Sequence, residues 1–185
     1  MTRRNSFWYM PAAVSVGCTL LSAGCSTDVG QSSTTTAEQE SPMEPTEPDH
    51  LADTETLTLT LEGQPFRVWV ARTDAEQRRG LMHITASQLA PLADGTERGM
   101  LFVFPDERVR SFWMRNTIIP LDIAYLRSDG TIVKTHTMPP LVTRTFTSIE
   151  PARFALEINA GRLDALGVYE QTRIEIPEAA FKMGR

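Results

Sequence analysis

An abrupt change in composition near residue 55 confines any folded domain to the second part of this chain. Residues 26–55 are rich in Ser, Thr, Glu and Pro and contain no aromatic residue. Such a segment cannot bury enough apolar surface to offset the entropy lost on ordering. From Thr56 the sequence alternates as Thr-Leu-Thr-Leu-Thr-Leu, which is typical of a half-buried strand. We therefore expect a disordered acidic linker over residues 25–55 and one domain over residues 56–185.

Charge is distributed unevenly between these two parts. Residues 25–55 carry eight acids and no base, whereas residues 56–185 carry 16 bases and 15 acids. The net charge of −5 therefore comes from the linker, and the domain itself is almost neutral. A neutral domain behind an acidic arm is a poor electrostatic match for DNA or RNA, so we expect no nucleic-acid partner.

The first 24 residues have the layout of a secretory signal peptide. Arg3 and Arg4 precede an apolar stretch over residues 7–21, which is shorter than the ~18 residues expected of a membrane-spanning helix. The run Leu-Ser-Ala-Gly-Cys that ends at Cys25 resembles a lipobox. This resemblance implies cleavage before Cys25 and a membrane anchor through its lipid. We expect an exported lipoprotein, facing the periplasm from the outer membrane if the cell has two membranes; an uncleaved N-terminal anchor is the alternative.

Strand patterns recur along residues 56–185 and are separated by turn residues. Strands are predicted at residues 56–61, 66–70, 100–104, 111–114, 121–126, 131–135, 153–158 and 173–176. Thr73 and Glu76 form a capping-box pattern, which predicts a short helix that ends at Gly80. Further short helices are expected near residues 87–89 and 163–166. The prediction is a mainly β domain, a compact β-sandwich or barrel with two or three short helices.

Several runs in this domain are unusual enough to carry a resemblance. They are Arg79-Gly80-Leu81-Met82, the Gly-Met-Leu-Phe-Val-Phe run over residues 99–104, the Phe-Trp-Met-Arg-Asn-Thr run over 112–117 with Pro120-Leu121-Asp122, and Leu156-Glu157 with Ala160-Gly161. Together they resemble the bacterial and archaeal family named domain of unknown function 192 (DUF192), over roughly residues 57–177. The resemblance implies a compact β-sandwich of jelly-roll type in a family whose members often look exported. It implies no reaction, because the family has no established activity.

An enzymatic interpretation depends on one pair of carboxylates. The sequence has no Gly-x-Ser-x-Gly, no His-Glu-x-x-His and no phosphate-binding glycine loop. Asp122 and Glu157 could serve as acid and base of a hydrolase that acts on envelope carbohydrate. The alternative is that both are structural, with Asp122 bonded to backbone groups and Glu157 paired with an arginine.

A metal site would depend on histidine and methionine, because both cysteines lie in the first 25 residues. His136 and Met138 are two positions apart and offer an imidazole and a soft thioether, which suit copper. Methionines also commonly fill gaps in apolar cores. No tighter cluster of such ligands is present, so we expect no cofactor.

A noncatalytic binding domain is the leading interpretation. Ligand sites combine apolar walls with a few well-placed polar groups. The candidate ligand-binding residues are Arg79, Trp113, Asn116, Thr117, Asp122 and Glu157. We expect the stiff segment before Pro120 to hold the Asn116 amide near Asp122, with Arg79 as the opposite charge. The ligand would be a small molecule or another envelope component. The alternative is that Asn116 and Thr117 only form a turn.

Overall fold

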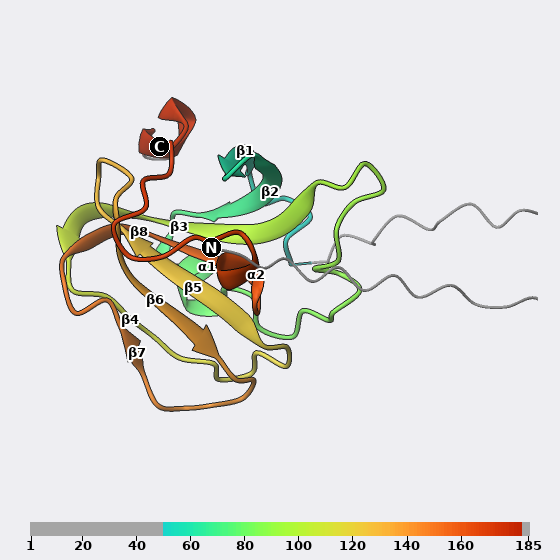
Figure 1. Cartoon of the computed structure of the whole chain (residues 1–185). Coiled ribbons are helices and arrows are strands. Elements are labelled where there is room, and N and C mark those ends of the chain that lie inside the picture. The colour runs from blue at the N-terminus through green and yellow to red at the C-terminus, as the bar shows by residue number, and fades with distance from the viewer. Residues whose placement is uncertain (1–49, 183–185) are drawn as a thin grey trace, which may run out of the picture. The chain divides into compact units, whose positions relative to one another are not determined.

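A mixed sheet of six strands forms the centre of the structure, a computed structural model that describes residues 50–182 (Figure 1). The strands lie side by side in the order β1 (Thr56–Leu61), β2 (Gln64–Ala71), β3 (Glu97–Arg108), β8 (Ala152–Asn159), β5 (Leu121–Leu126) and β6 (Ile132–Met138). Within this sheet β2 and β3 run parallel, and every other neighbouring pair is antiparallel. The mainly β prediction is confirmed, and the sheet is open rather than closed into a barrel.

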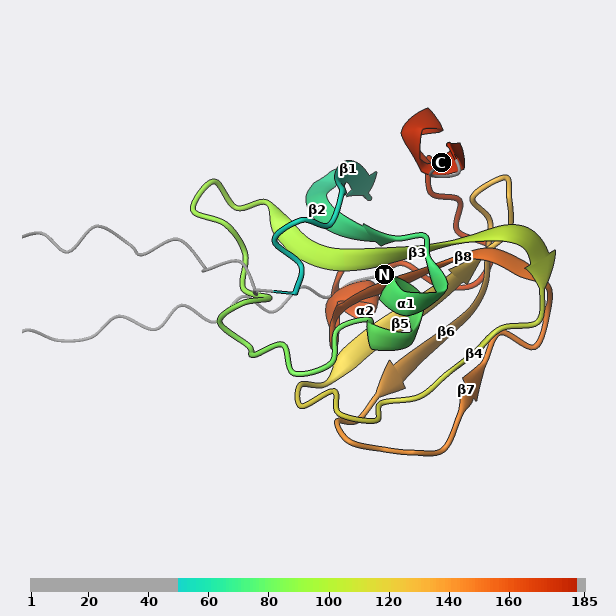
Figure 2. The same cartoon turned by 180° about the vertical axis from the view of Figure 1, so that it is seen from behind.

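Smaller elements cover both sides of this sheet. They are a two-stranded sheet of β4 (Ser111–Phe112) and β7 (Phe146–Thr147), the helices α1 (Asp74–Arg79) and α2 (Arg162–Ala165), and the 3-10 helix η1 (Glu178–Phe181). Views from the front and from behind place α1 and α2 on opposite sides of the large sheet (Figures 1 and 2). Within residues 50–182, no helix is both long and apolar enough to cross a bilayer.

Two apolar cores follow from the alternation of side chains along the central strands. On one side, which we call the β4 face, Met100 and Phe102 pack with Phe146 of β7. On the other side, the α2 face, Leu101 packs with Leu163 of α2. Residues 100–104 are therefore buried on both faces, as their continuous apolar run predicted.

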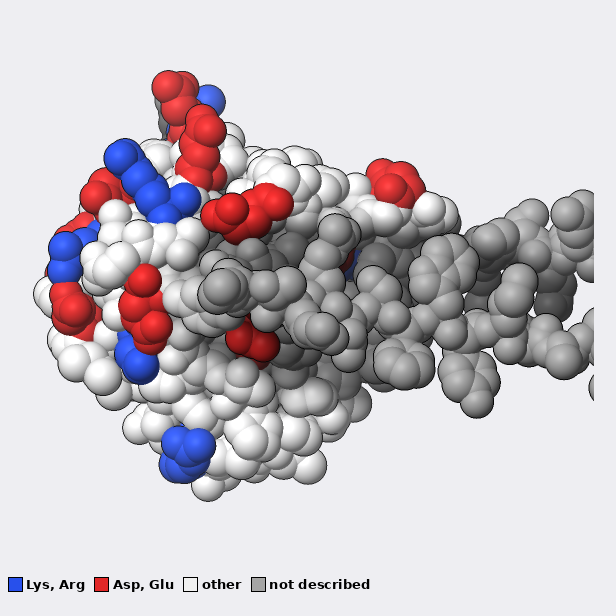
Figure 3. Space-filling view, in the orientation of Figure 1, with Lys and Arg blue, Asp and Glu red and all other residues white. Residues whose placement is uncertain are grey.

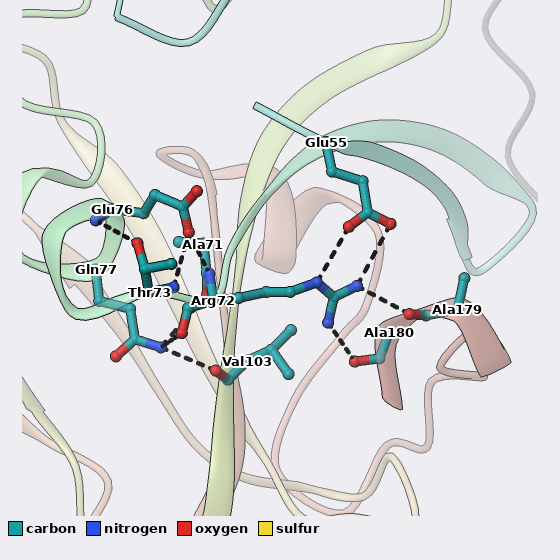
Figure 4. Close-up of polar contacts among 9 residues, drawn as sticks. All are labelled: Glu55, Ala71, Arg72, Thr73, Glu76, Gln77, Val103, Ala179 and Ala180. Carbon is teal, nitrogen blue, oxygen red and sulfur yellow. Dashed lines mark hydrogen bonds and ion pairs between the residues drawn. The ribbon is translucent and has the colours of Figure 1, made fainter. Parts of the chain in front are cut away.

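The capping box predicted for α1 is present and attaches the helix to the sheet (Figure 4). The Glu76 carboxylate accepts the backbone N–H groups of Arg72 and Thr73, both at 2.8 Å. The Gln77 amide donates to the Val103 carbonyl of β3 at 2.8 Å. The Arg72 guanidinium pairs with Glu55 at 3.1 Å and also donates to two carbonyl oxygens of η1, which belong to Ala179 and Ala180. These contacts hold the start of α1, β3 and η1 together.

Some predicted elements differ in the structure. Residues 87–89 form a turn, in which the Thr85 side chain accepts the Gln88 backbone N–H at 3.4 Å, rather than a helix. Residues 173–176 make only an isolated bridge, between Thr131 and Arg173. The strand predicted over 111–114 ends at Phe112, because the chain turns into a loop after it.

The folded domain also begins earlier than the predicted boundary at residue 56. Leu51 is 5% exposed and packs into the core of the β4 face. The Glu55 carbonyl accepts the Val70 backbone N–H at 2.8 Å, which extends the pairing of β1 with β2. A single apolar residue in a polar stretch has no periodicity, so the sequence pattern does not reveal the contact that Leu51 makes. The predicted signal peptide over residues 1–24, Cys25 and the linker as far as residue 49 lie outside the described residues.

Candidate functional site

Asp122 and Glu157 lie on opposite faces of the large sheet. Asp122 of β5 pairs with Ile158 of β8, and the next residue, Ile123, pairs with Glu157. Paired residues share a face and successive residues alternate, so Glu157 lies on the β4 face and Asp122 on the α2 face. An acid and a base must flank one bond to act together. The prediction of Asp122 and Glu157 as a catalytic pair is therefore wrong.

Asp122 has a structural role at the start of α2. Its carboxylate accepts the Thr137 hydroxyl at 2.7 Å and the Leu163 backbone N–H at 3.0 Å, and the residue is 2% exposed. The first N–H groups of a helix have no partner inside the helix, so Asp122 caps α2 from a neighbouring strand. Both partners lie on the α2 face. The predicted pairing of Asp122 with Arg79 and the Asn116 amide is therefore wrong.

Glu157 is a buried carboxyl group on the β4 face, between Met100 and Ile123. It is 5% exposed, and burial raises its pKa to about 8. Burial, with a smaller contribution from the charge of Glu157, also raises the pKa of Tyr125. Glu157 is thus largely protonated at neutral pH, and the predicted ion pair with an arginine is not among the salt bridges of the described residues.

Asn116 and Thr117 connect three loops through their backbone. The Asn116 carbonyl accepts the His83 N–H, and the Thr117 carbonyl accepts the Leu141 N–H, both at 2.9 Å. Asn116, His83 and Leu141 all adopt positive φ angles, between 60° and 65°. The Asn116 side chain is exposed and its amide lies 3.9 Å from the Met82 sulfur. These contacts favour the turn interpretation.

Figure 3 shows mostly uncharged atoms where the segment between β6 and β7 crosses the lower end of the molecule.

His136 and Met138 are both used in packing. The His136 Nε2 atom lies 2.8 Å from the Thr147 carbonyl, and its ring contacts Tyr125 and Phe146 edge-on. Met138 is fully buried in the core of the β4 face. Among residues 50–182, no group of three His, Cys, Asp or Glu side chains could hold a metal ion. The structure therefore gives the copper interpretation no support.

Trp113 differs from the other candidates because it lines an open groove of about 490 Å³. We call this space the α1–β4 groove; its lining residues are Asp74, Gln77, Arg78, Phe104, Val109, Arg110, Ser111, Phe112 and Trp113. Trp113 is 47% exposed and Val109 is 55% exposed. Arg79, another exposed candidate, lines a separate pocket of about 180 Å³ with Met100. The structure thus brings only Trp113 of the predicted residues into this groove.

The walls of the groove are held by specific contacts. Gln77 ties α1 to β3, as described above. The Arg110 guanidinium lies 4.0 Å from the centre of the Phe104 ring and donates to the Asp106 carboxylate at 2.7 Å. Phe112 meets the Phe104 ring edge-on, with their centres 6.4 Å apart. The result is a fixed aromatic wall with an arginine held against it.

The comparisons with known proteins agree with the resemblance in the sequence. The model of the DUF192 family, described as "Uncharacterized ACR", matches residues 57–176. This chain belongs to the DUF192 family. A search of curated proteins gave no match.

Two crystal structures are similar to this DUF192 domain. One is a protein from Sinorhizobium meliloti 1021 that has been provisionally described as a transcription regulator. It is 36% identical with a TM-score of 0.57, over 66% of this chain and 92% of that one. The other is a protein of unknown function from Novosphingobium aromaticivorans DSM 12444, 33% identical with a TM-score of 0.56, over 66% of this chain and 85% of that one.

The sequence reasoning missed most of the residues that line the groove of this DUF192 domain. Arg78, Val109 and Arg110 belong to α1 and to the link between β3 and β4, which are 30 residues apart in the chain. One signal was available: Val109 is a lone apolar residue between two arginines, a place where an apolar side chain has no core to enter. Arg78 lies near Val109 and Arg110 only because of the tertiary fold, which local sequence patterns do not reveal.

Proposed function

We propose that this DUF192 protein is an envelope lipoprotein whose domain binds a ligand in the α1–β4 groove without catalysing a reaction. The observation that carries the proposal is the half-exposed Trp113 beside the apolar wall of Phe104 and Val109. Large aromatic side chains with a polar edge are favoured in recognition sites, where they supply contact area at little cost in flexibility.

The composition of the groove supports a binding role rather than a catalytic one. Ser111 is the one hydroxyl among the lining residues, and these include no histidine, lysine or cysteine. A serine hydroxyl is a weak nucleophile unless a neighbouring base activates it. The acid in the lining, Asp74, is 89% exposed at its side chain and faces Arg78 at 3.9 Å.

The envelope part of the proposal is supported by the layout of residues 1–25. Transcription regulation, the provisional role of the Sinorhizobium protein, would require a nucleic-acid or regulatory partner. The 16 bases and 15 acids of residues 56–185 do not favour nucleic acid. Labelling with a radioactive fatty acid tests the anchor: the wild type should take up label and Cys25→Ser should not. Label retained in Cys25→Ser, or absent from the wild type, would refute lipidation at this residue.

A thermal-shift screen tests the groove. The probes are envelope saccharides, muropeptides, amphiphiles and extended peptides, and the proteins are the wild type, Trp113→Ala and Ile118→Ala. Ile118 is also 47% exposed but does not line the groove, so it is a matched control. A ligand of the groove should raise the melting temperature of the wild type and Ile118→Ala more than that of Trp113→Ala. If every stabilising probe acts equally on all three, the groove is not the binding site.

A further inference from the structure

The edge of β4 that faces away from β7 borders the α1–β4 groove. The Arg110 carbonyl accepts the Ser148 N–H at 2.8 Å, and the Met114 N–H donates to the Val142 carbonyl at 2.9 Å. In an antiparallel pair, backbone groups point alternately toward the partner strand and away from it. Residues 110, 112 and 114 therefore point toward β7, and Ser111 and Trp113 point the other way.

The partner strand supports this assignment independently. Thr147 is paired with Ser111, so its backbone groups should also point out of the small sheet. The Thr147 carbonyl does so, because it lies 2.8 Å from His136 Nε2 on the neighbouring β6. Thr147 thus has a partner on its outer side. Within residues 50–182, the backbone groups of Ser111 and Trp113 make no hydrogen bond outside the pairing of β4 with β7.

We propose that the α1–β4 groove binds an extended peptide of a partner protein, which adds as a strand to the free edge at Ser111 and Trp113. This inference rests on the proposed function and names its ligand class. A free strand edge with unpaired N–H and C=O groups is a template for another strand. A peptide can accept from the free N–H groups and donate to the free C=O groups, and α1 forms the opposite wall of the groove.

The side chains beside this edge indicate the composition of the peptide. Asp106 pairs with Arg108 at 2.5 Å and with Arg110 at 2.7 Å, so these three side chains carry one net positive charge next to Val109 and Arg110 of the groove lining. An acidic side chain of the peptide complements this charge. Along the edge, the exposed Val109 and Trp113 provide contacts for apolar side chains at alternate positions of the peptide.

The outer surface of the small sheet continues this apolar character. The structure has six exposed large apolar side chains among its described residues, and three of them, Val109, Trp113 and Ile149, flank β4 and β7. Ile149 is 65% exposed and has a φ of 63°, an unusual conformation for a β-branched residue. Strained, exposed positions of this kind often accompany binding sites.

Selection of nine-residue peptides from a random phage-displayed library against the purified mature chain tests the inference. Isothermal titration then measures the affinity of a synthetic peptide with the selected consensus. Ser111→Pro removes the N–H that faces the groove and leaves the bonds to β7, since proline is tolerated at a free strand edge. We expect at least a tenfold loss of affinity. Thr58→Pro is the matched control: Thr58 is exposed on β1, and its N–H faces away from β2, so peptide affinity should not change.

A scan of N-methyl groups along the peptide keeps the test independent of how Ser111→Pro folds. Strand addition predicts that methylation abolishes binding at alternate positions only, because alternate N–H groups point toward β4. Three results would overturn the inference: no peptide is selected, methylation has no alternating effect, or a well-folded Ser111→Pro binds as tightly as the wild type. A saccharide whose binding depends on Trp113 but not on Ser111→Pro would overturn it while leaving the proposed function intact.

Discussion

The carboxylate of Asp122 on β5 caps the backbone N–H of Leu163 at 3.0 Å, across 41 residues of the chain. The local N-cap of α2 is Gly161, which has no side chain to do this. The same carboxylate accepts the Thr137 hydroxyl of β6. One buried acid thus joins two strands to the helix that covers them.

Replacing Asp122 should lower the stability of the domain. Asp122→Ala leaves a buried N–H and a hydroxyl without their acceptor, and we expect the free energy of unfolding to fall by about 1–3 kcal/mol. Asp122→Asn keeps one acceptor oxygen and should lose less. Urea denaturation measures both, with the exposed Asp53→Ala as control. A loss in Asp122→Ala no larger than in the control would contradict the capping role.

Local signals in the sequence predicted most strands and α1. The alternation over 56–61 depends on neighbouring residues, and so does the capping box of Thr73 and Glu76; both are present. These signals succeed because hydrogen bonds within a hairpin or a helical turn join residues that are close in the chain.

The positions of the two candidate carboxylates relative to one another could not be predicted in the same way. Whether Asp122 and Glu157 share a face depends on the register of β5 against β8, and a shift of one residue would reverse the answer. That register is set by contacts between residues that are 28 to 38 positions apart in the chain. Trp113 was identified from its place in the unusual Phe-Trp-Met run, and the structure places it just beyond the end of β4, half-exposed.

Glu157 should make stability depend on pH in a specific direction. Its carboxyl group stays protonated in the folded protein up to about pH 8, but in the unfolded chain it ionises near its ordinary pKa of 4.5. Between these values the folded state holds the extra proton, so the free energy of unfolding falls as pH rises. Glu157→Gln removes this dependence. Urea denaturation at pH 5, 6, 7 and 8 should give a steeper decline for the wild type than for Glu157→Gln; parallel declines would refute the raised pKa.

Leu51 should contribute to stability although it lies in the polar stretch before β1. Leu51→Ala removes a side chain that is 5% exposed in the core of the β4 face, and we expect a loss of about 2–3 kcal/mol. Leu141→Ala is the matched control, because Leu141 is 59% exposed. Thermal unfolding of both variants measures the difference. Equal melting temperatures would mean that the domain does not depend on residues before Thr56.

Two glycines with the same φ angle allow the cost of steric crowding to be measured separately from the cost of backbone strain. Gly130 and Gly95 both have a φ of 83°. A Cβ atom on Gly130 would lie 1.9 Å from the Ile174 carbonyl oxygen, whereas one on Gly95 would meet nothing within 4 Å. Gly95→Ala should therefore cost about 1 kcal/mol from strain alone, and Gly130→Ala should cost clearly more, because the C-terminal segment must move. Chemical denaturation that ranks the two variants equally would contradict this account.

The order of the strands in space has a consequence for how the chain is made. Synthesis proceeds from β1 to β8, yet β8 lies in the middle of the sheet, between β3 and β5. Until residues 152–159 have been made, β3 and β5 both lack the strand that lies between them, and both consist largely of residues that are buried in the finished sheet. Open edges of this kind promote aggregation in incomplete chains. The large sheet therefore cannot complete its pairing until β8 has been synthesised. A chain whose synthesis stops before Ala152 keeps unpaired strand edges at β3 and β5, and we expect it to aggregate.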